Sequence, residues 1–181
     1  MRHALISTVV VAAVATLGDW IWAEFLSQHL IAAGLIHGAL LCLAMGAMVG
    51  HPVGRAATGA LAGIGIGVVG AALFYALAPV MRMAAMFPAW FALWVMLALL
   101  YHRLAGGVAI SLAITRGVIA GVGSGMAFYL VSGMWTRWNP QTINYLDHFA
   151  RWALAFAPGF AAIQGGRAVA RGQTSNVKGQ W

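Results

Sequence analysis

Charged residues are the scarcest class in this sequence, because Asp, Glu, Lys and Arg make up only 7% of its 181 residues. A soluble globular domain carries about 25% charged residues, so this chain cannot cover a water-facing surface with polar groups. Disorder is excluded too, because chains stay unfolded when hydrophobicity is low, and here 62% of the residues are hydrophobic. The composition therefore predicts an integral membrane protein.

Cysteine and acidic residues are also rare, with one cysteine (Cys42) and three acids in the chain. A single cysteine can form no internal disulfide and no cysteine-based metal cage. The net charge of +7 would suggest a nucleic-acid partner in a soluble protein. Here the basic residues stand singly between apolar runs, so we interpret them as topology signals and contacts with anionic lipid, and expect no nucleic-acid partner.

Recognisable enzymatic motifs are missing as well. The sequence has no glycine-rich phosphate loop ahead of Lys-Ser/Thr, no H-E-x-x-H and no G-x-S-x-G. We therefore expect a non-enzymatic protein without a cofactor.

What the chain does contain is a series of apolar runs of about 20 residues, the length that crosses a bilayer as a helix. They predict an all-α, single-domain bundle of six transmembrane helices over 4–22, 30–49, 56–78, 83–101, 117–134 and 144–164, with a tail at 165–181. A fifth helix beginning at 108 is the alternative, but a start at Gly117 keeps Arg116 at the membrane interface. The first run is expected to be retained rather than cleaved as a signal peptide, because Trp20 and Trp22 follow it as interface anchors.

Basic residues are distributed unevenly between the two ends of these helices. Seven lie on the side of the N-terminus (Arg2, Arg55, Arg103, Arg116, Arg167, Arg171 and Lys178), and three on the other side (Arg82, Arg137 and Arg151). The positive-inside rule then places both termini in the cytoplasm. The preference for Arg over Lys and the abundance of Gly suggest a GC-rich prokaryotic genome. We therefore expect the protein in a bacterial inner membrane.

Seven of the eight tryptophans fall in the half of the helices opposite the cytoplasm (Trp20, Trp22, Trp90, Trp94, Trp135, Trp138 and Trp152). An aromatic belt at one membrane interface is the simpler interpretation. A ligand vestibule facing the outer leaflet is the alternative.

Two glycine patterns superpose at an offset of 58 residues. They are Gly59, Gly63, Gly65 and Gly67 in one helix, and Gly117, Gly121, Gly123 and Gly125 in another. Glycines four apart let helix backbones approach closely where no hydrophobic force drives association. We therefore expect both helices to pack centrally, in a duplicated hairpin. The alternative is a smooth groove for a flat or acyl ligand along Gly63, Gly67, Gly121 and Gly125.

The last helix carries the densest polar group. Asp147 and Arg151 are four residues apart, so they share a helix face and can pair. His148 and Trp152 form a neighbouring stripe. The group predicts either the snorkelling start of a helix, a patch that binds a lipid headgroup, or a proton relay.

The other two acids, Asp19 and Glu24, are five residues apart and point to different helix faces. This spacing does not predict a paired-carboxylate catalyst. Asp19 lies within an apolar run and is expected to face protein rather than lipid. Arg82, Arg137 and Arg151 are its candidate partners.

Six histidines raise the question of haem or a metal. His37 alone lies well inside a predicted helix. A bis-histidine haem needs two ligands at similar depth on facing helices, and His102 lies at the opposite end of its helix. Haem or metal binding is therefore the third interpretation.

The C-terminal third resembles the insulin-induced gene (Insig) family of sterol-regulatory membrane proteins. The matching positions are Leu130, Val131, Ser132, Gly133, Trp135, Pro140, Tyr145, Phe156, Gly159, Gly166, Arg167 and Ala170. The resemblance implies six helices with cytosolic termini, and a non-enzymatic bundle that binds a sterol-like or diacylglycerol-like lipid in a central cavity, as a sensor would. It also implies a homo-oligomer, with a trimer as one option. The family's acidic residue for partner binding has no counterpart between Ala76 and Met81, so no protein partner is implied.

These observations together predict a lipid-binding membrane protein whose candidate site is Asp147, His148, Arg151 and Trp152 with the four glycines above. The main alternative is a small transporter or channel that uses Asp19, Asp147 and Arg151 as coupling residues.

Overall fold

The computed structural model describes residues 1–26, 28, 30–107, 109–131 and 144–165. Within these ranges there are six long helices and no strand. They are α1 (Arg2–Ile21), α2 (Leu30–Gly50), α3 (Ala56–Met81), α4 (Met86–Ala105), α5 (Ile110–Val131) and α7 (Tyr145–Gln164). Three short segments adjoin them: η1 (Trp22–Leu26), η2 (His51–Val53) and η3 (Arg82–Ala85). The predicted all-α class is confirmed for this part of the chain.

Four stretches are long and apolar enough to cross a membrane: Arg2–Leu26, Ile31–Val53, Ala56–Ala105 and Ile110–Val131. The third has 50 residues and contains α3, η3 and α4. Helix α7 is not among the four, and it carries Asp147, His148, Arg151 and Gln164 within 20 residues. The helices are compatible with a membrane protein, while the count of six spans and the side on which the termini lie stay predictions.

The helices begin and end close to the predicted positions, with one exception. Helix α5 begins at Ile110, so our preference for a start at Gly117 was wrong. Gly106 and Gly107 have φ of 65° and 69°, and this left-handed pair turns the chain sharply enough for the next helix to start at once. Arg116 consequently lies in the second turn of α5, where it is half-buried.

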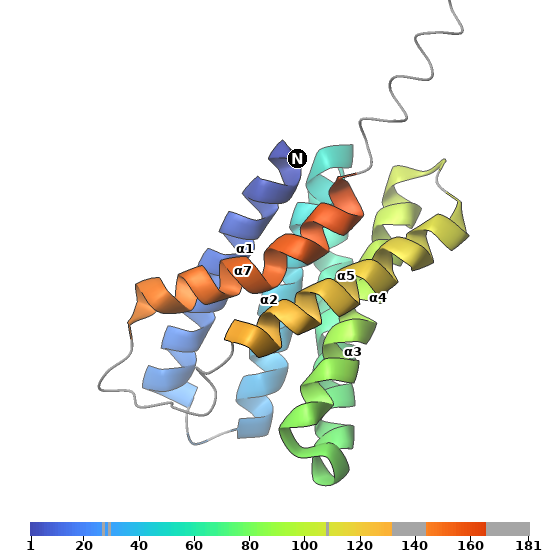
Figure 1. Cartoon of the computed structure of the whole chain (residues 1–181). Coiled ribbons are helices and arrows are strands. Elements are labelled where there is room, and N and C mark those ends of the chain that lie inside the picture. Colours follow the sequence, from blue (N-terminus) through green and yellow to red (C-terminus); the bar gives the residue numbers. More distant parts are fainter. Residues whose placement is uncertain (27, 29, 108, 132–143, 166–181) are drawn as a thin grey trace, which may run out of the picture.

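The six helices form a closed series of neighbours. α1 packs against α2, α2 against α3, α3 against α4, α4 against α5, α5 against α7, and α7 back against α1. Figure 1 shows α5 and α7 running obliquely across the front of the other helices. The buried hydrophobic residues come mainly from α1, α2, α4, α5 and α7.

Helix α3 lies at the edge of this core, so the prediction of a central position was wrong for it. Its buried residues are Gly59, Gly63, Gly67 and Gly70. These glycines contact the backbone of α2: a Cβ at Gly63 would meet the Cys42 carbonyl oxygen, and one at Gly67 would meet that of Gly38. Glycines allow this close approach but supply no side chain to fill a core.

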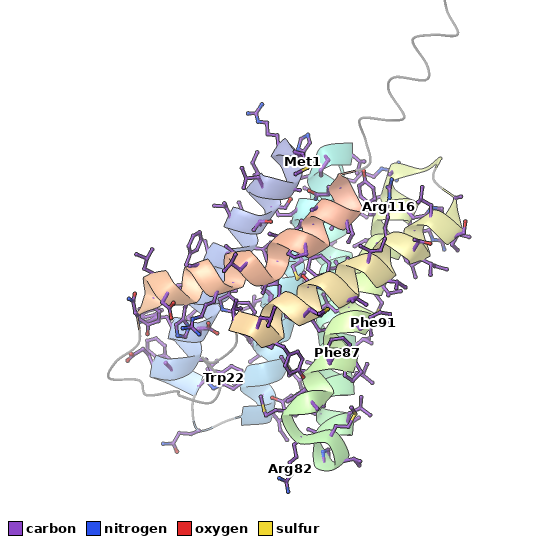
Figure 2. The ribbon with its side chains drawn as sticks, in the orientation of Figure 1. Met1, Trp22, Arg82, Phe87, Phe91 and Arg116 are labelled. Carbon is purple, nitrogen blue, oxygen red and sulfur yellow. The ribbon has the colours of Figure 1, made fainter. Side chains whose placement is uncertain are left out.

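The matching glycines of α5 make an equivalent contact with α4, but with different partners. A Cβ at Gly121 would lie 3.2 Å from the Phe91 Cα, and one at Gly125 would lie 3.0 Å from the Phe87 Cε2. Phe87 and Phe91 lie on the part of α4 that α5 crosses (Figure 2). Each of these two glycine-bearing helices therefore packs on the helix that precedes it in the sequence. Helix α3 contacts the backbone of α2, and α5 accommodates aromatic rings of α4.

Three of the seven tryptophans assigned to an aromatic belt lie in the core instead. Trp90, Trp94 and Trp152 are 5%, 0% and 1% exposed. Trp90 stacks on Phe128 and Phe156 with ring centroids 5.0 and 5.5 Å apart. The belt interpretation is wrong for these three, because their rings are buried in the contacts between α4, α5 and α7. Trp135 and Trp138 lie outside the described residues.

Candidate functional site

Asp19, on α1, is the most buried of the three acids and faces α7. It is 3% exposed. The Trp152 Nε1 donates a hydrogen bond to its Oδ2 at 2.6 Å, and the His148 Nδ1 lies 3.1 Å from the same oxygen. We call Asp19, His148 and Trp152 the Asp19 cluster. The expectation that Asp19 faces protein is confirmed, and its partners come from the stripe of α7 that the sequence identified.

Two of the arginines proposed as partners of Asp19, Arg82 and Arg151, do not fill that role. Arg82 is exposed, at the tip of the hairpin between α3 and α4 (Figure 2). Arg151 is engaged elsewhere, and Arg137 lies outside the described residues. Hydrogen bonds from an imidazole and an indole stabilise a buried carboxylate without a second permanent charge. Glu24 is exposed on η1 and takes no part in the cluster.

Asp147 and Arg151 form the predicted pair on the outside of α7. Arg151 Nε donates to Asp147 Oδ2 at 2.7 Å, with side chains 33% and 48% exposed. Arg151 Nη1 also donates to the Val131 carbonyl oxygen at 2.7 Å, which satisfies one of the last carbonyls of α5. The three residues predicted as one headgroup patch are therefore separated: His148 turns inward, and the other two face outward.

Helix α7 is fixed by further polar contacts that we did not predict. Asn144 caps its N-terminus by accepting hydrogen bonds from the backbone N–H groups of Leu146 and Asp147. At its other end, Ser7 donates to Gln164 Oε1 at 3.2 Å, and Gln164 Nε2 donates to the Met48 carbonyl oxygen at 3.0 Å. Polar residues inside otherwise apolar runs, such as Ser7 and Gln164, were the available signal.

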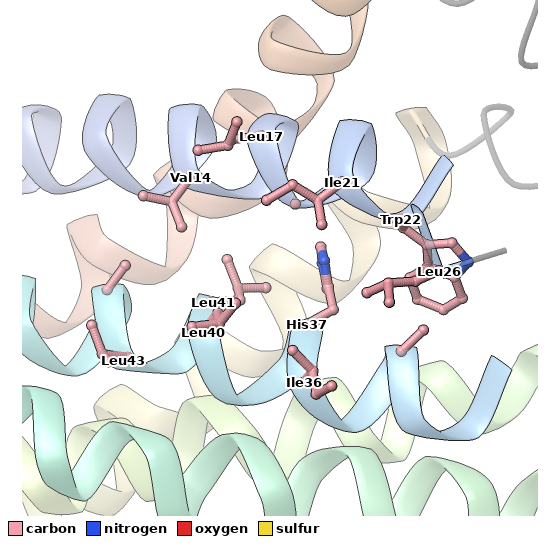
Figure 3. Close-up of a pocket in the computed structure, with 13 residues that line it drawn as sticks. Val14, Leu17, Ile21, Trp22, Leu26, Ile36, His37, Leu40, Leu41 and Leu43 are labelled. Atoms are coloured by element: carbon pink, nitrogen blue, oxygen red, sulfur yellow. The ribbon is translucent and has the colours of Figure 1, made fainter. Parts of the chain in front are cut away.

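A cavity lies between α1 and α2. It has a volume of about 250 Å³ and is lined by Val14, Leu17, Gly18, Ile21, Trp22, Leu26, Ala33, Ile36, His37, Leu40, Leu41, Leu43 and Ala44 (Figure 3). We call it the α1–α2 pocket. Leu17, Ile36 and Leu40 are exposed and form its rim, whereas Ala33, Leu41 and Ala44 are buried at its base.

Of the lining residues that the structure describes, Trp22 and His37 are the two that bring polar side-chain atoms to this pocket. Their rings meet edge to face with centroids 6.0 Å apart. The His37 ring also lies against Gly18, where an added Cβ would be 2.6 Å from its Nδ1. Trp22 begins η1, a π-helical turn that closes one end of the pocket, and such turns are frequent at functional sites. We had considered His37 only as a haem ligand.

The ligand groove that we gave as the alternative role of the glycines is filled at Gly63, Gly67, Gly121 and Gly125. Each of these positions is occupied by the backbone or a ring of the adjacent helix. Among the residues that the structure describes, no three His, Cys, Asp or Glu side chains come together in a way that could hold a metal ion.

Comparisons with known proteins return no match: no family model fits the sequence, and no curated protein or solved structure is significantly similar.

Proposed function

We propose that this protein binds an uncharged amphipathic lipid, either sterol-like or diacylglycerol-like, in the α1–α2 pocket. The observation that carries the proposal is the pocket itself, an apolar cavity with two polar rings gathered at one end. Lipid-binding sites need this combination, because the apolar body must be buried and the polar end must find a hydrogen-bond partner.

The lining chemistry favours a neutral lipid. Among the described residues that line the pocket there is no Lys or Arg that could neutralise a phosphate, and the side-chain nitrogens belong to an imidazole and an indole. A neutral imidazole both donates and accepts a hydrogen bond, which suits a hydroxyl or an ester. The polar end of the lipid would therefore lie near His37 and Trp22, rather than near Asp147 and Arg151.

The dimensions of the α1–α2 pocket favour a lipid that inserts one acyl chain or one edge of its ring system. Along α2 the lining runs from Ala33 to Ala44, about 16 Å at about 1.5 Å per residue. This is roughly half the hydrocarbon thickness of about 30 Å, so the pocket is long enough to hold a chain over about one leaflet. A volume of about 250 Å³ is slightly below the range of about 300–1,000 Å³ for complete ligand pockets. Part of the lipid would remain in the bilayer, beyond the rim of Leu17, Ile36 and Leu40.

The wider setting of this proposal comes from the sequence. We propose an Insig-like, homo-oligomeric protein of the bacterial inner membrane, with six spans and both termini in the cytoplasm, that senses or stores such a lipid. Asp147 and Arg151 pair on the outside of α7, away from Asp19, which makes them less suited to the coupling role of the transporter alternative.

Photocrosslinking would test the proposal. The protein, in phosphatidylcholine nanodiscs, is labelled with a photoactivatable sterol or a photoactivatable diacylglycerol, and the modified residues are mapped by mass spectrometry. We expect at least one probe to label rim residues such as Leu17, Ile36 and Leu40, with competition from unlabelled neutral lipid but not from phosphatidylglycerol.

A matched pair of variants separates the pocket from the rest of the lipid-facing surface. Val14→Phe fills the pocket, whereas Val10→Phe adds the same ring one turn earlier on α1, outside the lining. Labelling should fall severalfold in the first variant and stay at the wild-type level in the second. Equal labelling in wild type and Val14→Phe, or labelling spread evenly over all helices, would contradict the proposal.

A further inference from the structure

The buried carboxylate of Asp19 has no Lys or Arg among its hydrogen-bond partners in the described part of the chain. Placing a lone negative charge inside an apolar bundle is costly, and the cost falls when the site holds a proton. Asp19 and His148 together provide two basic positions in contact, Oδ2 and Nδ1, 3.1 Å apart. With one proton bound to the pair the site has no net charge, and without it the site carries one negative charge.

The same carboxylate adjoins the α1–α2 pocket. Asp19 follows Gly18, which forms part of the pocket wall, and the His37 ring packs directly on Gly18. Asp19 lies close enough to act electrostatically on His37. The charge of the Asp19 cluster therefore acts electrostatically on the polar end of the pocket, where the proposed lipid would place its hydroxyl or ester.

We propose that Asp19 and His148 form an intramembrane proton-binding site whose occupancy is linked to lipid binding in the α1–α2 pocket. The inference rests on the lipid-binding function proposed above and adds its regulation. Only one proton is exchanged: it leaves the pair for water when the site becomes anionic, and it returns when the site becomes neutral.

The sign of the linkage follows from the charge. A lipid that fills the pocket displaces water that would otherwise solvate a nearby charge, and removing that water is costly. Lipid affinity is therefore highest when the Asp19–His148 pair holds its proton, and it decreases as pH rises through the loss of that proton. Reciprocity requires lipid binding to favour the protonated pair by the same factor. Couplings between two sites are typically about 5-fold to 150-fold, so we expect a change of at least about fivefold in affinity.

Other titratable groups near the pair lie on the segments that pack on α1. They are Glu24 on η1, His37 on α2, and Tyr145, Asp147 and Arg151 on α7. Arg151 neutralises Asp147 directly. Glu24 is exposed, and the Tyr145 ring lies 6.1 Å from that of His148. His37 is the one group that both lines the pocket and responds to Asp19, so it needs its own control.

The first measurement follows the proton without any lipid ligand. The Trp152 indole N–H donates to Asp19, so its ¹⁵N-indole resonance, assigned through Trp152→Phe, reports the charge of the carboxylate. In nanodiscs we expect this resonance to move as the pH is raised and the pair loses its proton. The titration should be absent in Asp19→Asn, which keeps the acceptor oxygen and stays neutral. If that variant does not fold, His148→Gln is used, and there the titration should shift or disappear.

The second measurement follows lipid affinity over the same pH range with a fluorescent sterol and a fluorescent diacylglycerol. Wild type should lose at least about fivefold in affinity at high pH, Asp19→Asn should bind with constant affinity, and His37→Gln should bind more weakly but keep the pH dependence. A wild-type resonance that does not titrate, or an Asp19→Asn affinity that still depends on pH, would overturn the inference. If the resonance titrates while neither probe binds at any pH, the proton site stands, and the lipid-binding function and the linkage fail together.

Discussion

Replacing Gly63 with alanine should destabilise this protein, whereas the same replacement at Gly65 should stabilise it. The two glycines are two residues apart on α3, but their surroundings differ. A Cβ at Gly63 would overlap the Cys42 carbonyl oxygen and lie 3.2 Å from the Gly46 Cα. A Cβ at Gly65 would have no atom within 4 Å. The neighbours of Gly63 are backbone atoms, so they can yield only if α2 and α3 move apart.

The magnitudes follow from two opposing contributions. Alanine is better than glycine in a helix interior by about 0.8–1.0 kcal/mol, and this gain is common to both variants. Overpacking costs typically about 1–3 kcal/mol, and contact with rigid backbone places Gly63→Ala in the upper part of that range. We therefore expect a net loss of about 1–2 kcal/mol for Gly63→Ala and a gain of about 1 kcal/mol for Gly65→Ala. The difference between the variants should be about 2–3 kcal/mol.

Reversible unfolding by sodium dodecyl sulfate in mixed micelles, followed by circular dichroism, would measure both values. The two variants differ from wild type by the same methyl group, so effects on the unfolded chain largely cancel. A neutral or stabilising Gly63→Ala would refute the packing argument. If Gly65→Ala destabilises the protein in an oligomeric preparation, the open face of α3 is covered by a second copy, and the expected homo-oligomer gains support.

Three further predictions test other parts of the structure. Asp19→Leu should cost about 1–3 kcal/mol of unfolding free energy, because His148 and Trp152 lose their hydrogen-bond partner and relief of the carboxylate's desolvation offsets only part of that loss. Asp147→Asn should cost less than about 1 kcal/mol, since that pair is partly exposed, and comparable costs for the two variants would contradict this order. Arg82 has φ of 52°, so Arg82→Gly should stabilise the protein by about 1 kcal/mol while Arg82→Ala, which keeps the strain, should not, as thermal unfolding in detergent can show. Reporter fusions after Lys178 and in the loop at Arg137 should report opposite sides of the membrane, and a tail reporter active outside the cytoplasm would contradict the predicted topology.

The helix positions could be predicted from the sequence because the length of an apolar run is a local property. The start of α5 was predicted wrongly, since our argument gave the cost of placing Arg116 inside the membrane more weight than the turn at Gly106–Gly107. A long side chain can carry its charge toward the interface from within a helix, which lowers that cost. The Gly106–Gly107 turn was the stronger signal, and it favoured the earlier start.

The lateral environment of each helix was harder to predict than its position. In a membrane, an apolar residue can face either lipid or the core, so hydrophobicity does not separate the two. Trp90 and Trp94 were assigned to an interface belt for this reason, although they are buried. The glycine patterns predicted close packing, but the sequence contained no sign that α3 would lie at the edge.

In the candidate site too, a contact between residues close in the sequence was predictable, whereas contacts between distant residues were not. The Asp147–Arg151 pair was predictable, because a separation of four residues fixes its geometry on one helix. The Asp19 cluster joins residues 129 and 133 positions apart, so its partners depend on how α1 meets α7. Charge complementarity directed our search for a partner of Asp19 to arginines, and the structure instead supplies an imidazole and an indole.

Helix α1 is held very differently on its two sides. Toward α7 it is fixed near both ends, by the Asp19 cluster and by the contact between Ser7 and Gln164. Toward α2 it borders a cavity, while α2 itself is locked to α3 through glycine backbones that cannot approach further. A lipid entering between α1 and α2 would therefore act mainly on α1. Since the pocket wall at Gly18 continues directly into Asp19, the polar contacts between α1 and α7 are the first that such a displacement would reach.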